Sequence, residues 1–305
     1  MRTLAGHADV DGVRLYYEST GRGRPVVFVH GFGCGIRSWD CQIRALSDRY
    51  RTIAYDVRGH GLSDAPPDAA AYSQSTSVED LRGLLAHLGI ATAAVVGLSM
   101  GGNIALNFAL AHPAMVRALV VVDTGAGSDG TGEWIATTRS FAAAVDAGGM
   151  EAFADMAMAS PLFAEYCAKG PAAQRLIRSC LMTHRARGIA HTAREVLAKR
   201  PTIYALERQL ADLAVPTLLI VGEKDAPCRK VHEFMARTIP GARSLVIPRI
   251  GHLSNLEAPA AFNAALARFL GGARMMAPHP GGQHGQRAPG STRAAGRPGV
   301  GRRRR

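Results

Sequence analysis

Six short apolar runs recur along the chain and predict the strands of a buried sheet. They are rich in Val, Ile and Leu and lack apolar–polar alternation, so we expect both faces of each strand to be covered. Two further segments, residues 7–10 and 13–19, flank Asp11-Gly12, a dipeptide that favours a hairpin turn. Together they predict an eight-stranded, mostly parallel sheet. The six apolar runs are residues 25–30, 52–56, 94–98, 118–123, 217–222 and 244–248.

Helical patterns separate most of these runs and predict an α/β fold with helices on both faces of the sheet. Residues 78–88 have helical spacing, with Ser77 and Asp80 resembling a capping box and Gly89 placed to end the helix. Residues 103–111 form a second pattern that stops before Pro113. A third helix is expected over residues 38–46.

Between residues 125 and 205 the alternation of strands and helices stops, and the pattern predicts an inserted helical cap. So long a segment without structure of its own is unusual between neighbouring strands. We therefore expect a core of residues 1–124 and 206–272 and a cap of residues 125–205. Packing against the core is favoured over a pocket lining for the Met and Phe residues of the cap. These are Met150, Phe153, Met156, Met158, Phe163 and Met182. The expected cap helices are residues 140–145, 150–158, 172–182 and 190–198.

The length of 305 residues and the apolar fraction of 47% are typical of one large domain with an insertion. A net charge of +12 raises nucleic acid or an anionic membrane as a partner. However, eight of the 36 basic residues lie in residues 273–305, which have no acidic residue, leaving 28 basic against 24 acidic residues elsewhere. We predict that this tail is disordered and expect no nucleic-acid partner, with binding through the arginine tail as the alternative.

The five cysteines predict reduced thiols in the cytoplasm, because they are odd in number, scattered and free of CxxC spacing. The first ten residues lack the apolar stretch of a secretory signal, and no apolar run approaches the roughly 18 residues of a membrane helix. We expect no membrane association, and the sequence does not specify the oligomeric state. The cysteines are Cys34, Cys41, Cys167, Cys180 and Cys228.

Residues 97–101, Gly97-Leu98-Ser99-Met100-Gly101, form a G-x-S-x-G motif between an apolar run and a helical pattern. This is the context of a nucleophile elbow, where a sharp turn presents the serine at the carboxyl end of a strand. The glycines on either side leave room for the tight turn. The motif therefore predicts Ser99 as a catalytic nucleophile, against the alternative of a Gly-rich strand-to-helix turn.

A serine nucleophile requires a base, and His252 has the best position for it. It follows the last apolar run after a short loop, so it is expected at the same edge of the sheet as Ser99. Asp225, just after the run 217–222, is favoured as the acid that orients His252, with Asp123 second and Glu223 third. The histidines that fit less well are His87, His112, His184 and His191.

The tetrahedral intermediate of acyl transfer requires N–H donors for its oxyanion. We expect one from the backbone of Met100, the residue after the nucleophile. The second is expected from Phe32 in the loop His30-Gly31-Phe32-Gly33, which follows the first apolar run.

Five motifs together resemble the α/β-hydrolase superfamily, over about residues 10–270. The resemblance implies the triad and oxyanion residues named above, and it implies that residues 58–64 shape a wall near the site. The chain is most similar to small capped bacterial enzymes such as 3-oxoadipate enol-lactonases. The motifs are HGFG at 30–33, DVRGHGLSD at 56–64, GLSMGG at 97–102, VGEKD at 221–225 and GH at 251–252.

The expected function is hydrolysis of a small-molecule carboxylic ester or lactone through an acyl-enzyme on Ser99. No metal or organic cofactor is expected, because the chain has neither an HExxH motif nor a Walker loop. Two alternatives use the same scaffold. One is a C–C bond hydrolase of a vinylogous diketone with the same triad, and the other is a ligand-sensing protein without significant turnover.

Overall fold

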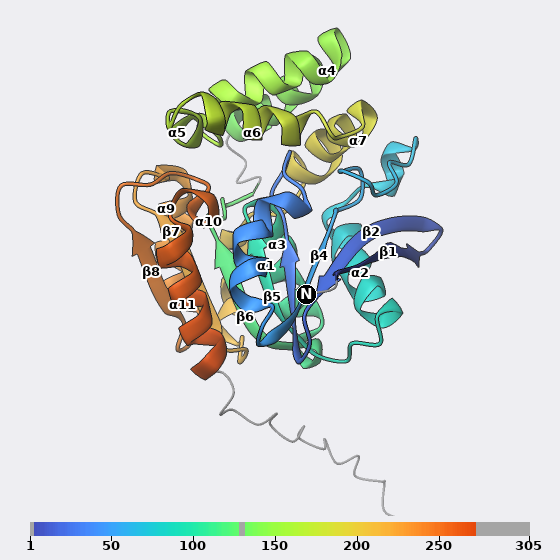
Figure 1. Cartoon of the computed structure of the whole chain (residues 1–305). Coiled ribbons are helices and arrows are strands. Elements are labelled where there is room, and N and C mark those ends of the chain that lie inside the picture. Colours follow the sequence, from blue (N-terminus) through green and yellow to red (C-terminus); the bar gives the residue numbers. More distant parts are fainter. Residues whose placement is uncertain (1–2, 128–131, 273–305) are drawn as a thin grey trace, which may run out of the picture. The chain divides into compact units, whose positions relative to one another are not determined.

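Eight strands form one sheet in the computed structural model, which describes residues 3–127 and 132–272 (Figure 1). Their order across the sheet is β1-β2-β4-β3-β5-β6-β7-β8. β2 pairs antiparallel with β1 and β4, and all other neighbours pair in parallel. The predicted fold class is confirmed. The strands are β1 Thr3–Val10, β2 Val13–Thr20, β3 Arg24–Val29, β4 Tyr50–Tyr55, β5 Ala93–Leu98, β6 Val116–Val122, β7 Thr217–Gly222 and β8 Arg243–Ile247.

The burial of each strand follows its place in the sheet. Every residue of the inner strands β5 and β7 is buried, as expected for apolar runs covered on both faces. β8 lies at the edge and is mostly exposed. The hairpin between β1 and β2 turns at Asp11 and Gly12, whose φ angles of 49° and 77° are both positive. A type I′ turn requires two positive φ angles, which explains the Asp-Gly dipeptide.

Helices cover both faces of the sheet. α1 and α11 pack together in front of it in the view of Figure 1, and α2 lies behind it beside α3. The helices of the described residues are α1 Asp40–Leu46, α2 Gln74–His87, α3 Met100–Ala111, α4 Gly132–Ala159, α5 Ala164–Cys167, α6 Pro171–Leu181, α7 Ala186–His191, α8 Glu207–Ala211, α9 Ala226–Thr238, α10 Ser254–Glu257 and α11 Pro259–Gly272.

The predicted start of α2 is wrong by one turn. The helix begins at Gln74, and its N-cap is Ser73, whose side-chain oxygen accepts the N–H of Thr76 at 2.9 Å. Asp80 is not part of a capping box. Its carboxylate accepts two hydrogen bonds from the guanidinium of Arg58, at 2.6 and 2.9 Å, and both side chains are buried. A buried arginine needs such a partner, and this demand decides the orientation of Asp80.

Between β6 and β7 the described residues form helices and no strand, as the sequence predicts. Residues 140–145 and 150–158 belong to the two halves of α4, which breaks at Gly148 and Gly149. Residues 172–182 match α6, and residues 190–198 overlap α7 and the π-helical turn Thr192–Leu197 that follows it. The short helix α5 was not predicted. The proposed division of the chain into core and cap at residues 125 and 205 stays a prediction.

The large side chains of this helical segment have different environments. Phe153 is fully buried, and its ring contacts Phe32 with centroids 5.6 Å apart, in agreement with packing against the core. In contrast, Met156 and Met182 are 40% and 37% exposed, so the packing interpretation is wrong for them. Sequence alone does not separate these cases, because each depends on which side of its helix faces the sheet.

All five cysteines are free thiols, as expected. Within the described part of the chain, no helix has both the length and the hydropathy needed to cross a membrane. The predicted disordered tail, residues 273–305, lies outside the described residues. The cytoplasmic location remains a prediction.

Candidate active site

Ser99 occupies a sharp turn between β5 and α3. Its φ and ψ angles are 54° and −113°, a conformation that is uncommon for a residue with a side chain. The turn requires glycine on both sides. A Cβ atom on Gly97 would overlap the carbonyl of Gly101, and one on Gly101 would overlap the carbonyl of Val29. The backbone N–H of Ser99 donates to the carbonyl of Val122 on β6 at 2.8 Å, which anchors the turn to the sheet.

The structure brings Ser99, His252 and Asp225 into one chain of hydrogen bonds. The distance from His252 Nδ1 to Asp225 Oδ2 is 2.6 Å, and from His252 Nε2 to Ser99 Oγ it is 2.9 Å. Because an ionised carboxylate only accepts hydrogen bonds, the ring proton lies on Nδ1. Nε2 therefore carries the lone pair and accepts a hydrogen bond from the hydroxyl group of Ser99, the arrangement that a general base requires.

The electrostatics of the pair agree with this arrangement. Burial of His252 opposes its protonated form, but the adjacent Asp225 carboxylate outweighs this effect and raises the pKa of His252 above 6.5. Burial of Asp225 opposes its ionised form, yet His252 lowers the pKa of Asp225 below 3.8. The two shifts have the directions expected of an ion pair, so Asp225 favours the positively charged form of the His252 imidazole.

The two other acidic candidates have different partners. Asp123 is fully buried, and its carboxylate accepts the N–H of Gly222 at 2.8 Å and both the N–H and the hydroxyl of Ser254, at 3.0 and 2.5 Å. It therefore ties the loop after His252 to the end of β7. The carboxylate of Glu223 accepts the N–H of Arg249, in the loop between β8 and His252, at 2.8 Å.

The four other histidine candidates lie away from Ser99. His112 contacts Glu79, and His191 contacts the carbonyl of Pro67. His87 is exposed on α2, and His184 accepts the N–H of Gly61 at 2.8 Å.

The expected oxyanion donors are both available. Within residues 3–127 and 132–272, neither the N–H of Phe32 nor that of Met100 has a hydrogen-bond acceptor. The loop of Phe32 lies beside the nucleophile, since a Cβ on Gly31 would be 3.3 Å from the Cβ of Ser99. Met100 is the first residue of α3, where N–H groups have no helical partner.

Three buried histidines, which the sequence analysis did not assign to the site, support the Phe32 loop. His30 Nε2 accepts the N–H of Val57 at 2.9 Å, so its Nδ1 donates to the carbonyl of Gly31 at 2.8 Å. The ring of His60 lies between those of His30 and His184, with centroids 5.1 Å from each. The resemblance implied that residues 58–64 shape a wall of the site, but none of them lines the pocket. His60 instead contacts the ring of Phe32 and accepts the N–H of Gly33 at 3.4 Å.

The pocket above Ser99 is nearly closed, with a cavity volume of about 10 Å³, and most of its lining is apolar. In the part of the chain that the structure describes, His252 and the thiol of Cys34 are the titratable side chains that line it. Leu162 and Phe163 come from the helical segment between β6 and β7, so that segment closes the pocket over the nucleophile. The lining residues are Gly31, Phe32, Cys34, Leu98, Ser99, Leu162, Phe163, His252 and Leu253.

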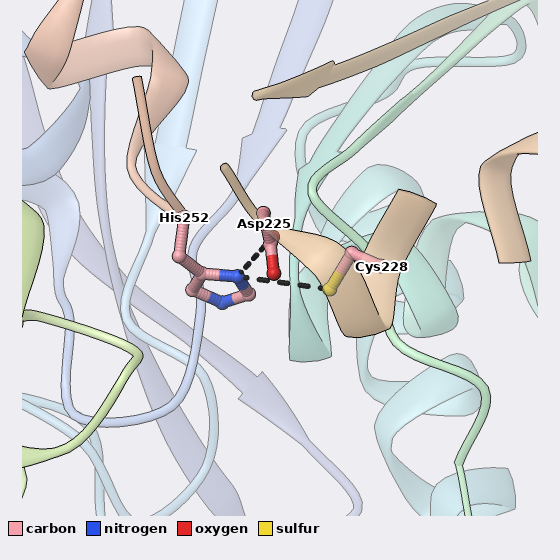
Figure 2. Close-up of side chains that lie close together, drawn as sticks. All are labelled: Asp225, Cys228 and His252. Atoms are coloured by element: carbon pink, nitrogen blue, oxygen red, sulfur yellow. Dashed lines mark hydrogen bonds and ion pairs between the residues drawn. The ribbon is translucent and has the colours of Figure 1, made fainter. Parts of the chain in front are cut away.

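Cys228 is a further neighbour of the site that the sequence analysis did not assign. Its sulfur lies 3.7 Å from His252 Nδ1 (Figure 2). The same sulfur lies 3.4 Å from the backbone carbonyl of Asp123. Within residues 3–127 and 132–272, Asp225, Cys228 and His252 are the one group of three side chains whose donor atoms are arranged to hold a metal ion. The sequence did contain a signal for Cys228. It follows Asp225, the predicted acid, by three residues, and this spacing places both residues at the start of one helix.

Acidification is expected to destabilise the fold through the three buried histidines. Burial lowers the pKa of His30 and of His184 to about 4, and that of His60 well below 6.5. The unfolded chain therefore binds protons that the folded chain does not, and stability is lost as the pH falls from about 6.5 to about 4. Over this pH range, each histidine lowers the free energy of unfolding by at most about 1.4 kcal/mol per pH unit.

Urea denaturation across this pH range measures the effect. His184→Gln should make the pH dependence shallower, whereas His87→Gln, at an exposed position, should leave it unchanged. Equal pH dependence in the wild type and His184→Gln contradicts the prediction.

The family model described as alpha/beta hydrolase fold matches residues 24–259. The chain therefore belongs to the α/β hydrolase fold family. It is 30% identical over 266 residues to a Bacillus subtilis (strain 168) protein provisionally named 2-succinyl-6-hydroxy-2,4-cyclohexadiene-1-carboxylate synthase, with 85% of this chain and 96% of that protein covered.

Two solved structures are similar over nearly their whole length. The enol-lactonase from Burkholderia xenovorans LB400 has a TM-score of 0.77 and 28% identity, with 87% of this chain and 100% of that chain covered. A thermophilic esterase from Thermogutta terrifontis has a TM-score of 0.78 and 31% identity, with 88% and 99% covered. These likenesses agree with an enzyme of the α/β hydrolase class.

Proposed function

We propose that the protein hydrolyses small, uncharged carboxylic esters or lactones, with Ser99 as nucleophile, His252 as base and Asp225 as the residue that orients it. The observation that carries this proposal is the continuous hydrogen-bond chain from Ser99 Oγ through the imidazole of His252 to Asp225. Such a chain activates a hydroxyl that is otherwise a weak nucleophile.

The reaction proceeds in two steps. In the first, His252 Nε2 takes the proton of Ser99 while Oγ attacks the carbonyl carbon of the substrate. The oxyanion of the tetrahedral intermediate accepts hydrogen bonds from the N–H groups of Phe32 and Met100. The imidazolium then protonates the leaving alcohol, and an acyl-enzyme results. In the second step His252 removes a proton from water, which attacks the acyl group; the imidazolium then returns this proton to Ser99 Oγ, and the acid is released.

The pocket supports the choice of a small, uncharged acyl group. The cavity of about 10 Å³ has room for about one water molecule, and apolar side chains such as Leu162 and Phe163 pack closely around Ser99. Because no Lys, Arg, Asp or Glu among the described residues lines it, a charged acyl group would be desolvated there without a partner from residues 3–127 or 132–272. The two similar structures, an enol-lactonase and an esterase, agree with this substrate class.

Replacement of the nucleophile tests the assignment directly. Ser99→Ala should abolish covalent labelling by a fluorophosphonate probe, because the attacking oxygen is absent. The measurement is mass spectrometry of the labelled chain. Ser140→Ala, on the exposed side of α4, is the matched control and should label like the wild type. Persistent labelling of Ser99→Ala would refute the role of Ser99.

Replacement of the orienting acid tests the second half of the chain. Asp225→Asn should lower kcat by about 10⁴, since an amide no longer favours the tautomer in which Nε2 accepts a proton. The measurement is the steady-state hydrolysis of phenyl acetate, with circular dichroism to show that the variant is folded. An unchanged kcat would transfer the role to another carboxylate, with Asp123 as the next candidate.

Variation of the acyl chain tests the size of the pocket. The kcat/KM for an acetyl ester should exceed that for an octanoyl ester by at least about tenfold, because the longer chain does not fit. Leu162→Ala should narrow this difference by enlarging the pocket. Leu176→Ala, at a residue 44% exposed on α6, is the control and should not alter it. A preference for octanoyl esters in the wild type would contradict a small acyl pocket.

A further inference from the structure

The Nδ1 side of His252 has two potential metal ligands rather than one. Asp225 Oδ2 lies 2.6 Å from Nδ1 and Cys228 Sγ lies 3.7 Å from it. Figure 2 shows the carboxylate and the sulfur on the same side of the imidazole, while the other ring nitrogen points away from both. The three donor atoms all lie within 4.8 Å of one another.

The local fold explains this arrangement. Asp225 is the N-cap of α9, and Cys228 follows it by three residues in the first turn of that helix. Residues three apart in a helix share one face, so both side chains point toward the loop that carries His252. All three are buried, with exposed fractions of 8% for Asp225, 4% for Cys228 and 6% for His252.

The spacing is close to that of a zinc site. Zn²⁺ bound tetrahedrally at about 2.0 Å from nitrogen and about 2.3 Å from sulfur places these two ligands roughly 3.5 Å apart. The observed separation of 3.7 Å between Sγ and Nδ1 is near this value. The Asp225 carboxylate oxygen and Nδ1 are now 2.6 Å apart in a hydrogen bond. To bind the same Zn²⁺ ion, these two atoms would have to move apart by about 0.7 Å. Imidazole, thiolate and carboxylate are all ligands that Zn²⁺ accepts.

We propose that Asp225, Cys228 and His252 form an inhibitory site for a thiophilic divalent cation such as Zn²⁺ or Cd²⁺. The inference rests on the proposed function, because it assigns a means of inhibition to the same histidine. The cation binds the imidazole through Nδ1, the thiolate of Cys228 and the carboxylate of Asp225. The thiol releases its proton to solvent, and the imidazole proton moves from Nδ1 to Nε2. His252 then has no lone pair with which to accept the proton of Ser99.

The surroundings of the site favour a cation in one respect and oppose it in another. The carboxyl groups of Asp225 and Asp123 both act on His252 by favouring positive charge there. In contrast, burial raises the pKa of the Cys228 thiol well above 9, so metal binding must displace a tightly held proton. A thiol that coordinates a metal ion does lose its proton, because the positive charge of the ion stabilises the thiolate.

The test compares inhibition by Zn²⁺ in the full-length wild type and in Cys228→Ser, each relative to its own rate of phenyl acetate hydrolysis. The serine hydroxyl is a much poorer ligand than a thiolate, so the Zn²⁺ concentration for half inhibition should rise at least about tenfold. Loss of a residue that only hydrogen-bonds to a metal ligand already weakens metal binding by about that factor. Mg²⁺, which prefers oxygen ligands, should not inhibit the wild type. A chelator should restore activity.

Cys34→Ser is the matched control, because Cys34 is also buried and lines the pocket beside Ser99. It should remain as sensitive to Zn²⁺ as the wild type. Equal sensitivity of the wild type and Cys228→Ser, or loss of sensitivity in Cys34→Ser alone, would overturn the proposed site while leaving ester hydrolysis intact.

A direct readout does not depend on turnover. Titration with Cd²⁺ should produce the ultraviolet absorption of a cadmium–thiolate bond in the wild type and in Cys34→Ser, but not in Cys228→Ser. If the protein bound Cd²⁺ through Cys228 yet hydrolysed no ester, the metal site would stand and the proposed function would fail. An absent cadmium–thiolate band in the wild type refutes the metal site.

Discussion

The close approach of three backbone segments at the turn of Ser99 is the constraint on which the rest of the site depends. Gly97 and Gly101 allow the end of β5, the start of α3 and the end of β3 to touch without side chains between them. The turn is held to β6 by the N–H of Ser99. A strained backbone persists where its surroundings leave no alternative, and here it presents the hydroxyl at the carboxyl edge of the sheet.

Parallel strands bring the remaining groups to that same edge. Asp123 follows β6, Asp225 follows β7 and His252 follows β8, so two carboxyl groups approach one imidazole. Their environments separate them: burial raises the pKa of Asp123 to about 7, whereas His252 offsets the burial of Asp225 and lowers its pKa. The first carboxyl group organises backbone, and the second pairs with His252. A site with two acids thus assigns them different tasks through solvation and hydrogen bonding.

The helical segment between β6 and β7 determines how much of this edge a substrate can reach. Leu162 and Phe163 narrow the pocket over Ser99, and Phe153 packs on the ring of Phe32 in the oxyanion loop. His184, from the same segment, accepts the N–H of Gly61, and its ring contacts that of His60 edge to face. Neutral, buried imidazoles therefore connect the segment above the site to the loop that supplies the N–H of Phe32. In the proposed mechanism, access to Ser99 and stabilisation of the oxyanion would both depend on this packed unit.

The sequence by itself determined the sheet, because unbroken apolar runs can only be satisfied by burial on both faces. It also singled out Ser99, since the glycines beside it are a local requirement of the turn. What depended on distant contacts was decided only by the tertiary structure. The choice of Asp225 over Asp123 rests on which carboxylate reaches His252, and the partner of Asp80 is an arginine 22 residues away in the chain. The nearness of Cys228 to the imidazole, and the small volume of the pocket, likewise depend on side chains from separate elements, and no local pattern encodes where those elements meet.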